Sequence, residues 1–129
     1  MIHHVTFGTN DVERARRFYD PLMDLVGLRQ LKMNEGGVHY GTGEILFSLV
    51  TTANGRPASA GNGVHVAFQA RDRAMVRKFY ELALKHGGRS DGEPGLRPHY
   101  DVNYYGAFVF DPDGNKIEAV TLSGSSMED

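Results

Sequence analysis

Apolar and polar positions alternate in short runs at two places along the chain and then change to a helical spacing. The runs Ile2 to Gly8 and Val64 to Ala70 are rich in β-branched and aromatic residues, which is typical of strands. The residues after each run place apolar side chains three and four positions apart, which predicts an amphipathic helix. The sequence therefore predicts two strand-helix units in succession.

Both predicted helices have start and stop signals. Asn10 is the expected N-cap of the first helix, which ends at Gly27. Asp72 is the expected cap of the second helix, which ends at Gly87-Gly88. Pro21 lies inside the first helix, where it removes a hydrogen bond and clashes with the preceding turn, so we expect a kink or a restart there.

Extended runs after each helix predict the remaining strands. Asp111-Pro112-Asp113-Gly114-Asn115 is a strong turn signal that predicts a hairpin between the last two strands. Residues 53–62, rich in Ala, Gly, Ser and Pro, are the expected linker between the two halves. In the second half, the strand that directly follows the helix is not evident. The expected strands are 28–33, 38–41 and 45–51 in the first half and 104–110 and 116–122 in the second.

A repeat with a constant offset links the two halves. The offset is 61 residues for two strand histidines (65 − 4) and for two helix aspartates (72 − 11). Each half is therefore expected to be one copy of a βαβββ module, spanning residues 1–52 and 63–122 of a single α+β domain, 1–129. The matching segments are His4-Val5-Thr6-Phe7 with His65-Val66-Ala67-Phe68, Asp11 with Asp72, Arg17-Phe18-Tyr19 with Lys78-Phe79-Tyr80, and Gly27 with Gly88.

Composition narrows the classes of function. The chain has 129 residues, of which 40% are hydrophobic, as expected for one compact domain. Its 14 basic residues nearly balance its 16 acidic ones, so neither a nucleic acid nor a membrane surface is an expected partner. The absence of cysteine excludes disulfides and zinc-thiolate sites. Because no signal peptide or membrane-spanning run is evident, we expect a cytoplasmic location.

Three residues are candidate ligands of one divalent metal ion. The repeat makes His4 and His65 equivalent, so a pseudo-two-fold arrangement of the modules would bring their side chains together. Glu118 lies in an otherwise apolar strand, where an unpaired buried carboxylate is costly and a metal ion would keep it ionised. Two imidazoles and a carboxylate suit Fe, Mn, Ni or Zn. Taken singly, each residue is more simply explained as a structural histidine or a solvent-facing glutamate; their coincidence with the repeat favours the metal site.

The segment before the final hairpin is dense in aromatic and polar side chains and is a candidate pocket lid. Arg97 is a candidate for binding a carboxylate or phosphonate, and His99 for moving protons near neutral pH. Tyr104 is a candidate for orienting a substrate oxygen, and Tyr105 for contacting substrate, although strand alternation lets only one of them face inward. A surface loop with stacked tyrosines is the competing explanation. His39 is a weaker candidate for substrate binding.

These motifs together resemble the vicinal oxygen chelate superfamily, which includes glyoxalase I, extradiol dioxygenases, fosfomycin-resistance enzymes and bleomycin-resistance proteins. The resemblance covers nearly the whole chain and includes the segment Asp111 to Glu118 as well as the two matching strand motifs. It implies two βαβββ modules forming a glyoxalase-like open barrel around a metal cleft, with the family's ligands falling on His4, His65 and Glu118. It also implies a homodimer and a small-molecule substrate.

The first module bears on the type of reaction. Glyoxalase I enzymes carry a fourth ligand, usually Glu or Gln, on the last strand of that module, whereas Leu46 to Ser48 offer no acid and Glu44 lies too early. The resemblance therefore favours an open three-ligand site over glyoxalase I activity. We expect a metal-dependent lyase, isomerase, transferase or dioxygenase that acts on a small oxygen-rich substrate. The alternative is a metal-free protein that sequesters a small molecule, as in the bleomycin-resistance branch; metal analysis discriminates the two.

Overall fold

Two modules of the same βαβββ order make up the fold. The computed structural model describes residues 1–124. The order confirms the predicted α+β class and the repeat, including the hairpin at the end of the second module. The first module contains β1 (Val5–Gly8), α1 (Val12–Val26), β2 (Arg29–Asn34), β3 (Gly37–Gly41) and β4 (Ile45–Val50). The second contains β5 (His65–Gln69), α2 (Arg73–Lys85), β6 (Arg89–Leu96), β7 (Tyr105–Phe110) and β8 (Lys116–Thr121).

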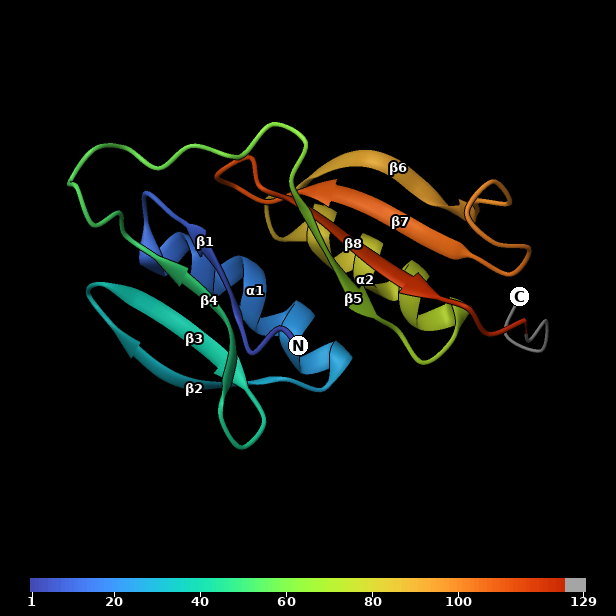
Figure 1. Ribbon diagram of the computed structural model, residues 1–129, viewed down its shortest axis with the longest axis horizontal. Helices are drawn as coiled ribbons and strands as arrows, with labels where there is room; N and C mark the ends of the chain where they lie inside the picture. Colours follow the sequence, from blue (N-terminus) through green and yellow to red (C-terminus); the bar gives the residue numbers. More distant parts are fainter. Residues whose placement is uncertain (125–129) are drawn as a thin grey trace.

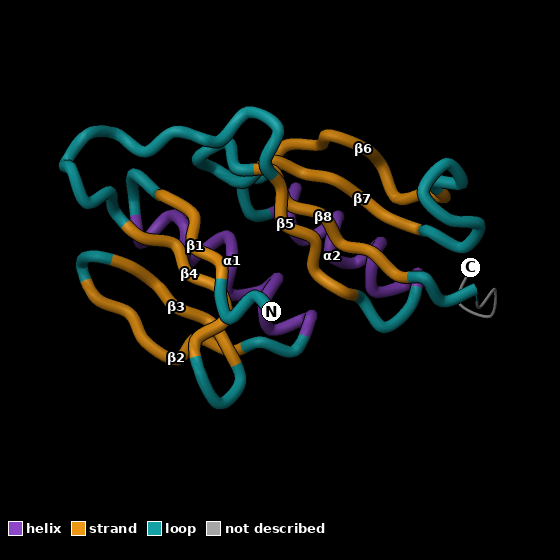
Figure 2. Tube along the Cα trace, viewed as in Figure 1, coloured by secondary structure: helices purple, strands orange, loops and turns teal. Residues whose placement is uncertain are grey.

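Each module forms one four-stranded sheet with a single helix on one face. The strand orders are β1-β4-β3-β2 and β5-β8-β7-β6, with the first pair of each sheet parallel and the others antiparallel. Both helices lie behind the sheets, which stand side by side (Figure 1). The connection from β4 to β5 runs as an irregular segment along one edge of both modules (Figure 2). The sheets therefore form an open arrangement, and each keeps one face free of helix.

Helix α1 begins at a different residue from the one expected. Its N-cap is Asp11, whose carboxylate accepts a hydrogen bond from the Arg14 backbone N–H at 2.9 Å. The prediction of Asn10 as the cap was wrong. The Asn10 side chain instead exchanges two hydrogen bonds with the backbone of Ala58 in the linker, at 2.7 and 3.1 Å. Asp11 and Asp72 are thus both caps, as the repeat requires.

Pro21 does not interrupt α1. The helix continues from Val12 to Val26, so the restart that the sequence predicted is absent. Proline removes only one backbone donor. The residues that follow it, Leu22 and Met23, are fully buried in the core, and this burial holds the last turns of the helix in place.

The strand that the sequence left unassigned is β6. It pairs with β7, and the register shifts between Ser90 and Gly92 and again between Gly92 and Gly95. Two glycines and Pro94 inside the strand conceal the alternation that would have identified it, since such residues are typical of bulges and turns. Tyr104 lies just before β7 rather than within it.

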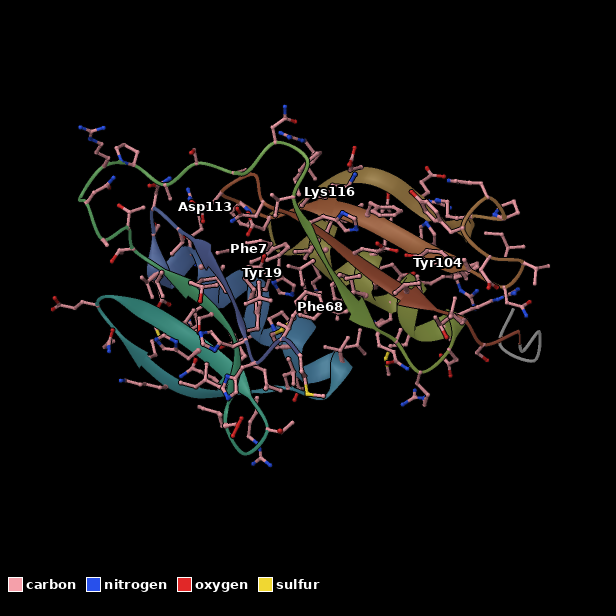
Figure 3. The ribbon with its side chains drawn as sticks, viewed as in Figure 1. Phe7, Tyr19, Phe68, Tyr104, Asp113 and Lys116 are labelled. Carbon is pink, nitrogen blue, oxygen red and sulfur yellow. The ribbon has the colours of Figure 1, made fainter. Side chains whose placement is uncertain are left out.

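Aromatic packing and one turn join the modules. Phe47 of β4 contacts both Phe7 and Phe68, with ring centroids 5.6 and 5.1 Å apart, and Figure 3 shows Phe7 and Phe68 near the junction. The turn between β7 and β8 reaches back to the first module through Asp113. Its carboxylate accepts hydrogen bonds from the Thr9 hydroxyl at 2.5 Å and from the Arg14 guanidinium at 2.6 Å. We call this set of contacts the inter-module latch.

Two sequence-based expectations extend beyond what the structure describes or tests. The expected single domain ends at residue 129, and residues 125–129 lie outside the described part of the chain. Between residues 1 and 124, neither helix has the length and apolar character needed to cross a membrane.

Candidate functional site

The helix-free face of the second sheet carries the polar side chains of the site. Strand alternation places Ile117 and Ala119 of β8 in the core, whereas Lys116 and Glu118 point to the opposite face. The register pairs Glu118 with Ala67 of β5 on one side and with Phe108 of β7 on the other. Residues from three strands therefore surround Glu118 on this face, which we call the site face.

Glu118 is buried although it stands on an open face. Its side chain is 1% exposed because His65 and Tyr104 cover it. The Nε2 atom of His65 lies 3.1 Å from Oε1 of Glu118, and the Tyr104 hydroxyl donates a hydrogen bond to Oε2. The His65 side chain is 42% exposed, so the pair remains reachable from solvent. The carboxylate thus has a protein partner on each oxygen.

Gly106 gives Glu118 the space that it occupies. A Cβ atom at this position would lie 3.0 Å from Oε2 of Glu118 and 3.3 Å from Cε1 of Tyr104. Any larger residue would therefore push the carboxylate or the tyrosine out of place. The sequence showed Gly106 only as a glycine within an apolar strand, and nothing in the pattern linked it to Glu118.

The electrostatics keep Tyr104 in its protonated form. Burial raises the pKa of its hydroxyl far above the ordinary value for tyrosine, and the hydrogen bond to Glu118 raises it further. An ionised phenolate beside a buried carboxylate would repel it. Tyr104 is therefore a hydrogen-bond donor to Glu118 throughout the physiological range of pH.

The helix-free face of the first sheet repeats this geometry with different residues. Its register aligns Thr6, Ser48 and His39 across three strands, as Ala67, Glu118 and Phe108 are aligned in the second sheet. Ser48 thus occupies the position equivalent to Glu118, and His39 the position equivalent to Phe108.

Ser48 and His39 form a pair on that face. Nδ1 of His39 lies 2.7 Å from the Ser48 hydroxyl oxygen. Burial lowers the pKa of His39, and the positive charge of Lys32 lowers it further. Together with His4 and Thr6, the pair lines a hollow of about 340 Å³. On the strand where the resemblance led us to look for a fourth ligand, the side chain is therefore a serine that is hydrogen-bonded to a histidine.

The structure brings two of the three predicted metal ligands together. His65 and Glu118 are adjacent, whereas His4 precedes β1 in the other sheet and is exposed. Nδ1 of His4 lies 2.9 Å from Nδ1 of His3, and Nε2 of His3 lies 2.6 Å from Glu44. Within residues 1–124 no three His, Asp or Glu side chains form a cluster suited to a metal ion. Within one chain, the three predicted ligands therefore lie at two separate places.

The His65 and Glu118 side chains on the site face are chemically suited to bind a metal ion. An imidazole nitrogen and a carboxylate oxygen at 3.1 Å are two ligands of the kind that Zn and Fe(II) bind, and Tyr104 fixes the other carboxylate oxygen. Two protein ligands are fewer than catalytic metal sites usually have. The pair therefore offers ligand atoms of the right type for a metal ion, but one chain supplies fewer of them than such a site needs.

The predicted lid residues lie in different places. Arg97 lies over the ring of Phe108, with its Cζ atom 5.5 Å from the ring centroid. His99 is exposed and stacks on Tyr100 at 4.1 Å, and Tyr100 in turn contacts Tyr104. Among residues 1–124, His99 forms no hydrogen bond or ion pair with His65 or Glu118.

Tyr105 faces the helix side of the same sheet. Its hydroxyl accepts a hydrogen bond from Arg77 of α2 at 3.4 Å, and the Arg73 guanidinium lies 5.2 Å from its ring centroid. Of the two neighbouring tyrosines, Tyr104 therefore lies on the site face and Tyr105 on the helix face. This agrees with the expectation that only one of them could face inward.

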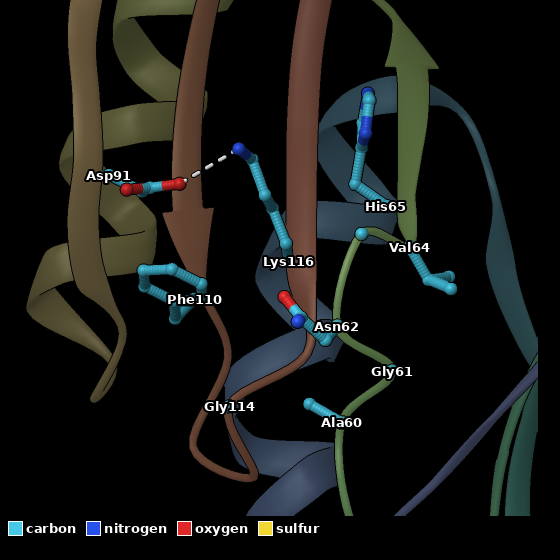
Figure 4. A pocket seen from close by; sticks show the side chains of 10 residues that line it. Ala60, Gly61, Asn62, Val64, His65, Asp91, Phe110, Gly114 and Lys116 are labelled. Atoms are coloured by element: carbon cyan, nitrogen blue, oxygen red, sulfur yellow. Dashed lines mark ion pairs between the residues drawn. The ribbon is translucent and has the colours of Figure 1, made fainter.

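A hollow of about 460 Å³ lies beside His65. The segment from Ala60 to Val64 forms one wall, and Lys116 and Asp91 form an ion pair of 2.9 Å on another (Figure 4). Sequence reasoning missed Lys116. Its position two residues before Glu118 on one strand places both on the same face, so the alternation rule could have found it.

Comparison with known proteins gives a consistent result. A family model described as Glyoxalase/Bleomycin resistance protein/Dioxygenase superfamily matches residues 1–119. Comparison with curated proteins gave no match. Among solved structures, a glyoxalase/bleomycin resistance protein from Albidiferax ferrireducens T118 is similar, with 34% sequence identity, a TM-score of 0.81 and coverage of 91% of this chain and 94% of that chain.

Two more distant structures share the fold. A lactoylglutathione lyase from Agrobacterium tumefaciens is 23% identical, with a TM-score of 0.64 and coverage of 93% of this chain and 92% of that chain. The fosfomycin resistance protein FosX from Mesorhizobium loti is 22% identical, with a TM-score of 0.66 and coverage of 97% and 92%. At this level of identity the likeness concerns the fold alone.

Proposed function

Because this chain belongs to the Glyoxalase/Bleomycin resistance protein/Dioxygenase superfamily, we propose that it is a metal-dependent enzyme that acts on a small oxygen-rich substrate. His65 and Glu118 hold one divalent metal ion, of Fe, Mn, Ni or Zn, together with His4. The observation that carries this proposal is the buried carboxylate of Glu118, held between His65 and Tyr104 on a sheet face that is open to solvent. A buried carboxylate at an accessible position is the kind of group that functional sites contain.

The third ligand comes from a second copy of the chain in this proposal. His4, just before β1, lines the hollow on the free face of the first sheet, and the other two ligands stand on the free face of the second. A two-fold dimer that sets the first sheet of each copy against the second sheet of the other completes two identical sites. It also covers both helix-free faces, which is the reason that we favour a homodimer over a monomer.

The bound ion would act as a Lewis acid on vicinal substrate oxygens. Tyr104 fixes the orientation of Glu118 and keeps its second oxygen from turning toward the substrate. The low pKa of His39 keeps its imidazole neutral near pH 7, so it can accept a proton from a substrate bound between the two faces.

The first sheet bears on the type of reaction that we propose. The position equivalent to Glu118 is Ser48, whose hydroxyl is paired with His39. Glu44 is paired with His3 near the start of β4. Three protein ligands would leave positions for substrate and water, and this arrangement supports a lyase, isomerase, transferase or dioxygenase reaction other than that of glyoxalase I.

Metal analysis tests the proposal. Wild-type protein, Glu118→Gln and Glu44→Gln are reconstituted with Fe, Mn, Ni or Zn, and bound metal is counted after gel filtration. We expect about one ion per chain for the wild type and for Glu44→Gln, and a loss of binding by a factor of at least ten for Glu118→Gln. Equal metal content in all three proteins would contradict the assignment of the site.

One observation favours a second candidate function. His65 and Glu118 satisfy each other without any ion, so the site face is also compatible with a metal-free protein that sequesters a small molecule. In that case the wild type binds no stoichiometric metal under any of the reconstitution conditions. Monomeric wild-type protein at micromolar concentration in sedimentation would also speak against the shared site.

A further inference from the structure

His65 carries an imidazole that few hydrogen bonds hold in place. It is the first residue of β5, an edge strand of its sheet, and its side chain is 42% exposed. Among residues 1–124, its ring has one hydrogen-bond partner, Glu118, at Nε2, while Nδ1 forms no hydrogen bond. A histidine that binds metal usually has a hydrogen bond at its other ring nitrogen, and this bond fixes the orientation of the ring. Another kind of contact must therefore fix the ring of His65.

Phe108, the aromatic neighbour of His65, is buried but lies outside the hydrophobic core. It is 8% exposed although it stands on the helix-free face of the sheet. In the part of the chain that the structure describes, the core cluster includes its neighbours Ala107 and Val109 but not Phe108. These neighbours point to the opposite face of β7 because side chains alternate along a strand. The burial of Phe108 is therefore due to residues of the site face that cover its ring.

Two anchored cations cover the ring of Phe108. Nζ of Lys116 lies 4.9 Å from the ring centroid, and Cζ of Arg97 lies 5.5 Å from it. Cations at such distances are attracted to the face of an aromatic ring. Lys116 is held by an ion pair of 2.9 Å with Asp91, and Arg97 donates a hydrogen bond to the backbone oxygen of Glu93 at 2.8 Å. The ring is thus fixed by side chains that are themselves held in place.

A bulge in β6 gives the ring its space. The register between β6 and β7 shifts on both sides of Gly92, which is paired with Phe108. A Cβ atom at Gly92 would lie 3.2 Å from Cδ2 of Phe108 and 3.2 Å from Nη2 of Arg97. Any side chain at this position would therefore push against both the ring and the guanidinium. Bulges are frequent next to functional sites, where they change the direction of a side chain. The irregularity of β6 thus determines where Phe108 lies.

The fixed ring of Phe108 meets the imidazole of His65 nearly at a right angle. The ring centroids lie 5.9 Å apart and the planes differ by 70°, which is a favourable arrangement for an aromatic pair. Phe108 is also paired with Glu118 in the register of β7 and β8. We propose that Phe108 is a positioning residue, which fixes the orientation of the His65 imidazole and keeps Nε2 directed toward Glu118 for metal binding. This inference rests on the proposed function.

NMR spectroscopy of the metal-free protein tests whether Phe108 holds the imidazole. The chain has 6 histidines, and the ring signals of His65 are those that are missing in His65→Gln. In the wild type, we expect NOEs between the rings of His65 and Phe108 and a high order parameter of the imidazole from carbon relaxation. Phe108→Leu keeps an apolar side chain but removes the aromatic ring, so the order parameter should fall toward that of an unrestrained side chain.

Phe110→Leu is the matched control. Phe110 lies on the same face of β7, and its ring also carries a cation, Arg89, at 4.9 Å. In the described part of the chain, it forms no aromatic pair with His65. We expect this variant to keep the order parameter of the wild type. Metal titration should show a loss of affinity of about 10- to 100-fold for Phe108→Leu and of less than about twofold for Phe110→Leu.

Two results would overturn the inference. One is an imidazole that is as ordered in Phe108→Leu as in the wild type, and the other is a mobile imidazole in Phe108→Leu with unchanged metal affinity. If Phe108→Leu does not fold, the wild-type spectra decide the question, since NOEs with a rigid ring support the inference and their absence contradicts it. A wild type that binds no metal refutes the proposed function, whereas the order of the His65 ring still shows whether Phe108 positions it.

Discussion

At the scale of single residues, the partners of Glu118 determine what the carboxylate can do. The sequence predicted a polar residue of special role because Glu118 interrupts an apolar strand, and the repeat predicted His65. It placed Tyr104 near the pocket but could not pair it with Glu118. That contact depends on how the loop after β6 returns to β7, and on the space above Gly106, which are properties of the folded chain.

Replacement of Tyr104 by phenylalanine tests the role of its hydroxyl. Tyr104→Phe removes the donor to Oε2 of Glu118 and leaves the ring in place. We expect metal affinity to fall by about 10- to 100-fold, because outer partners of metal ligands typically contribute this much. Tyr105→Phe is the matched control, since that hydroxyl faces α2. Similar losses in both variants, measured by metal titration, would rule out a specific effect of Tyr104.

Asp111 gives a prediction about pH. Its carboxylate accepts a hydrogen bond from the Tyr19 hydroxyl at 2.6 Å, and burial raises its pKa although the hydrogen bonds oppose this. A group whose pKa is raised by folding contributes stability that is complete below its unfolded pKa, about 4, and is lost as the pH rises through the folded pKa. The stability of the wild type relative to Asp111→Asn should therefore be larger at pH 4 than at pH 7. Urea titrations at both values measure it; the reverse order would refute the direction of the shift.

At the scale of helices and strands, the sequence predicted the elements that are determined by local residue patterns. Both helices, most strands and the final hairpin follow from periodicity and turn residues, and the offset of 61 residues (65 − 4) revealed the repeat. Strand β6 was not predictable because Gly92, Pro94 and Gly95 disrupt its alternation. The role of Asn10 was missed for a different reason. Its hydrogen-bond partner, Ala58, lies 48 residues away in the sequence. A cap is inferred from neighbouring residues, so this long-range contact could not be predicted.

The inter-module latch gives a prediction about stability. Asp113 is 3% exposed and binds Thr9, Asn10 and Arg14, which are all at the start of the first helix. Asp113→Ala leaves these donors without an acceptor. We expect the free energy of unfolding to fall by about 2 to 3 kcal/mol. This range already allows for solvent screening of the ion pair, because the Arg14 side chain is 40% exposed. Urea denaturation measures the loss, with exposed Asp24→Ala as control. A change below about 0.5 kcal/mol would show that the latch does not hold the modules together.

At the scale of the whole molecule, the two modules present their functional faces without bringing them together. The sequence predicted equivalent histidines and implied a cleft between the modules, but it could not say which modules face each other. The structure sets the sheets side by side in one chain, with the helices behind both (Figure 1). His4 is consequently separated from His65 and Glu118, and the complete ligand set requires a second copy in our account.

The central claim is that two copies of the chain share each metal site. Mixing two variants that each lack one ligand tests it most directly. His4→Ala and Glu118→Gln each remove one of the three ligands from every site, so neither alone should bind metal with wild-type affinity. Unfolding and refolding them together in equal amounts produces mixed dimers, in which one of the two sites has all three ligands. The account predicts that the mixture recovers about one high-affinity ion per mixed dimer. Metal binding that stays at the level of the separate variants, or a His4→Ala protein that binds as the wild type does, would contradict it.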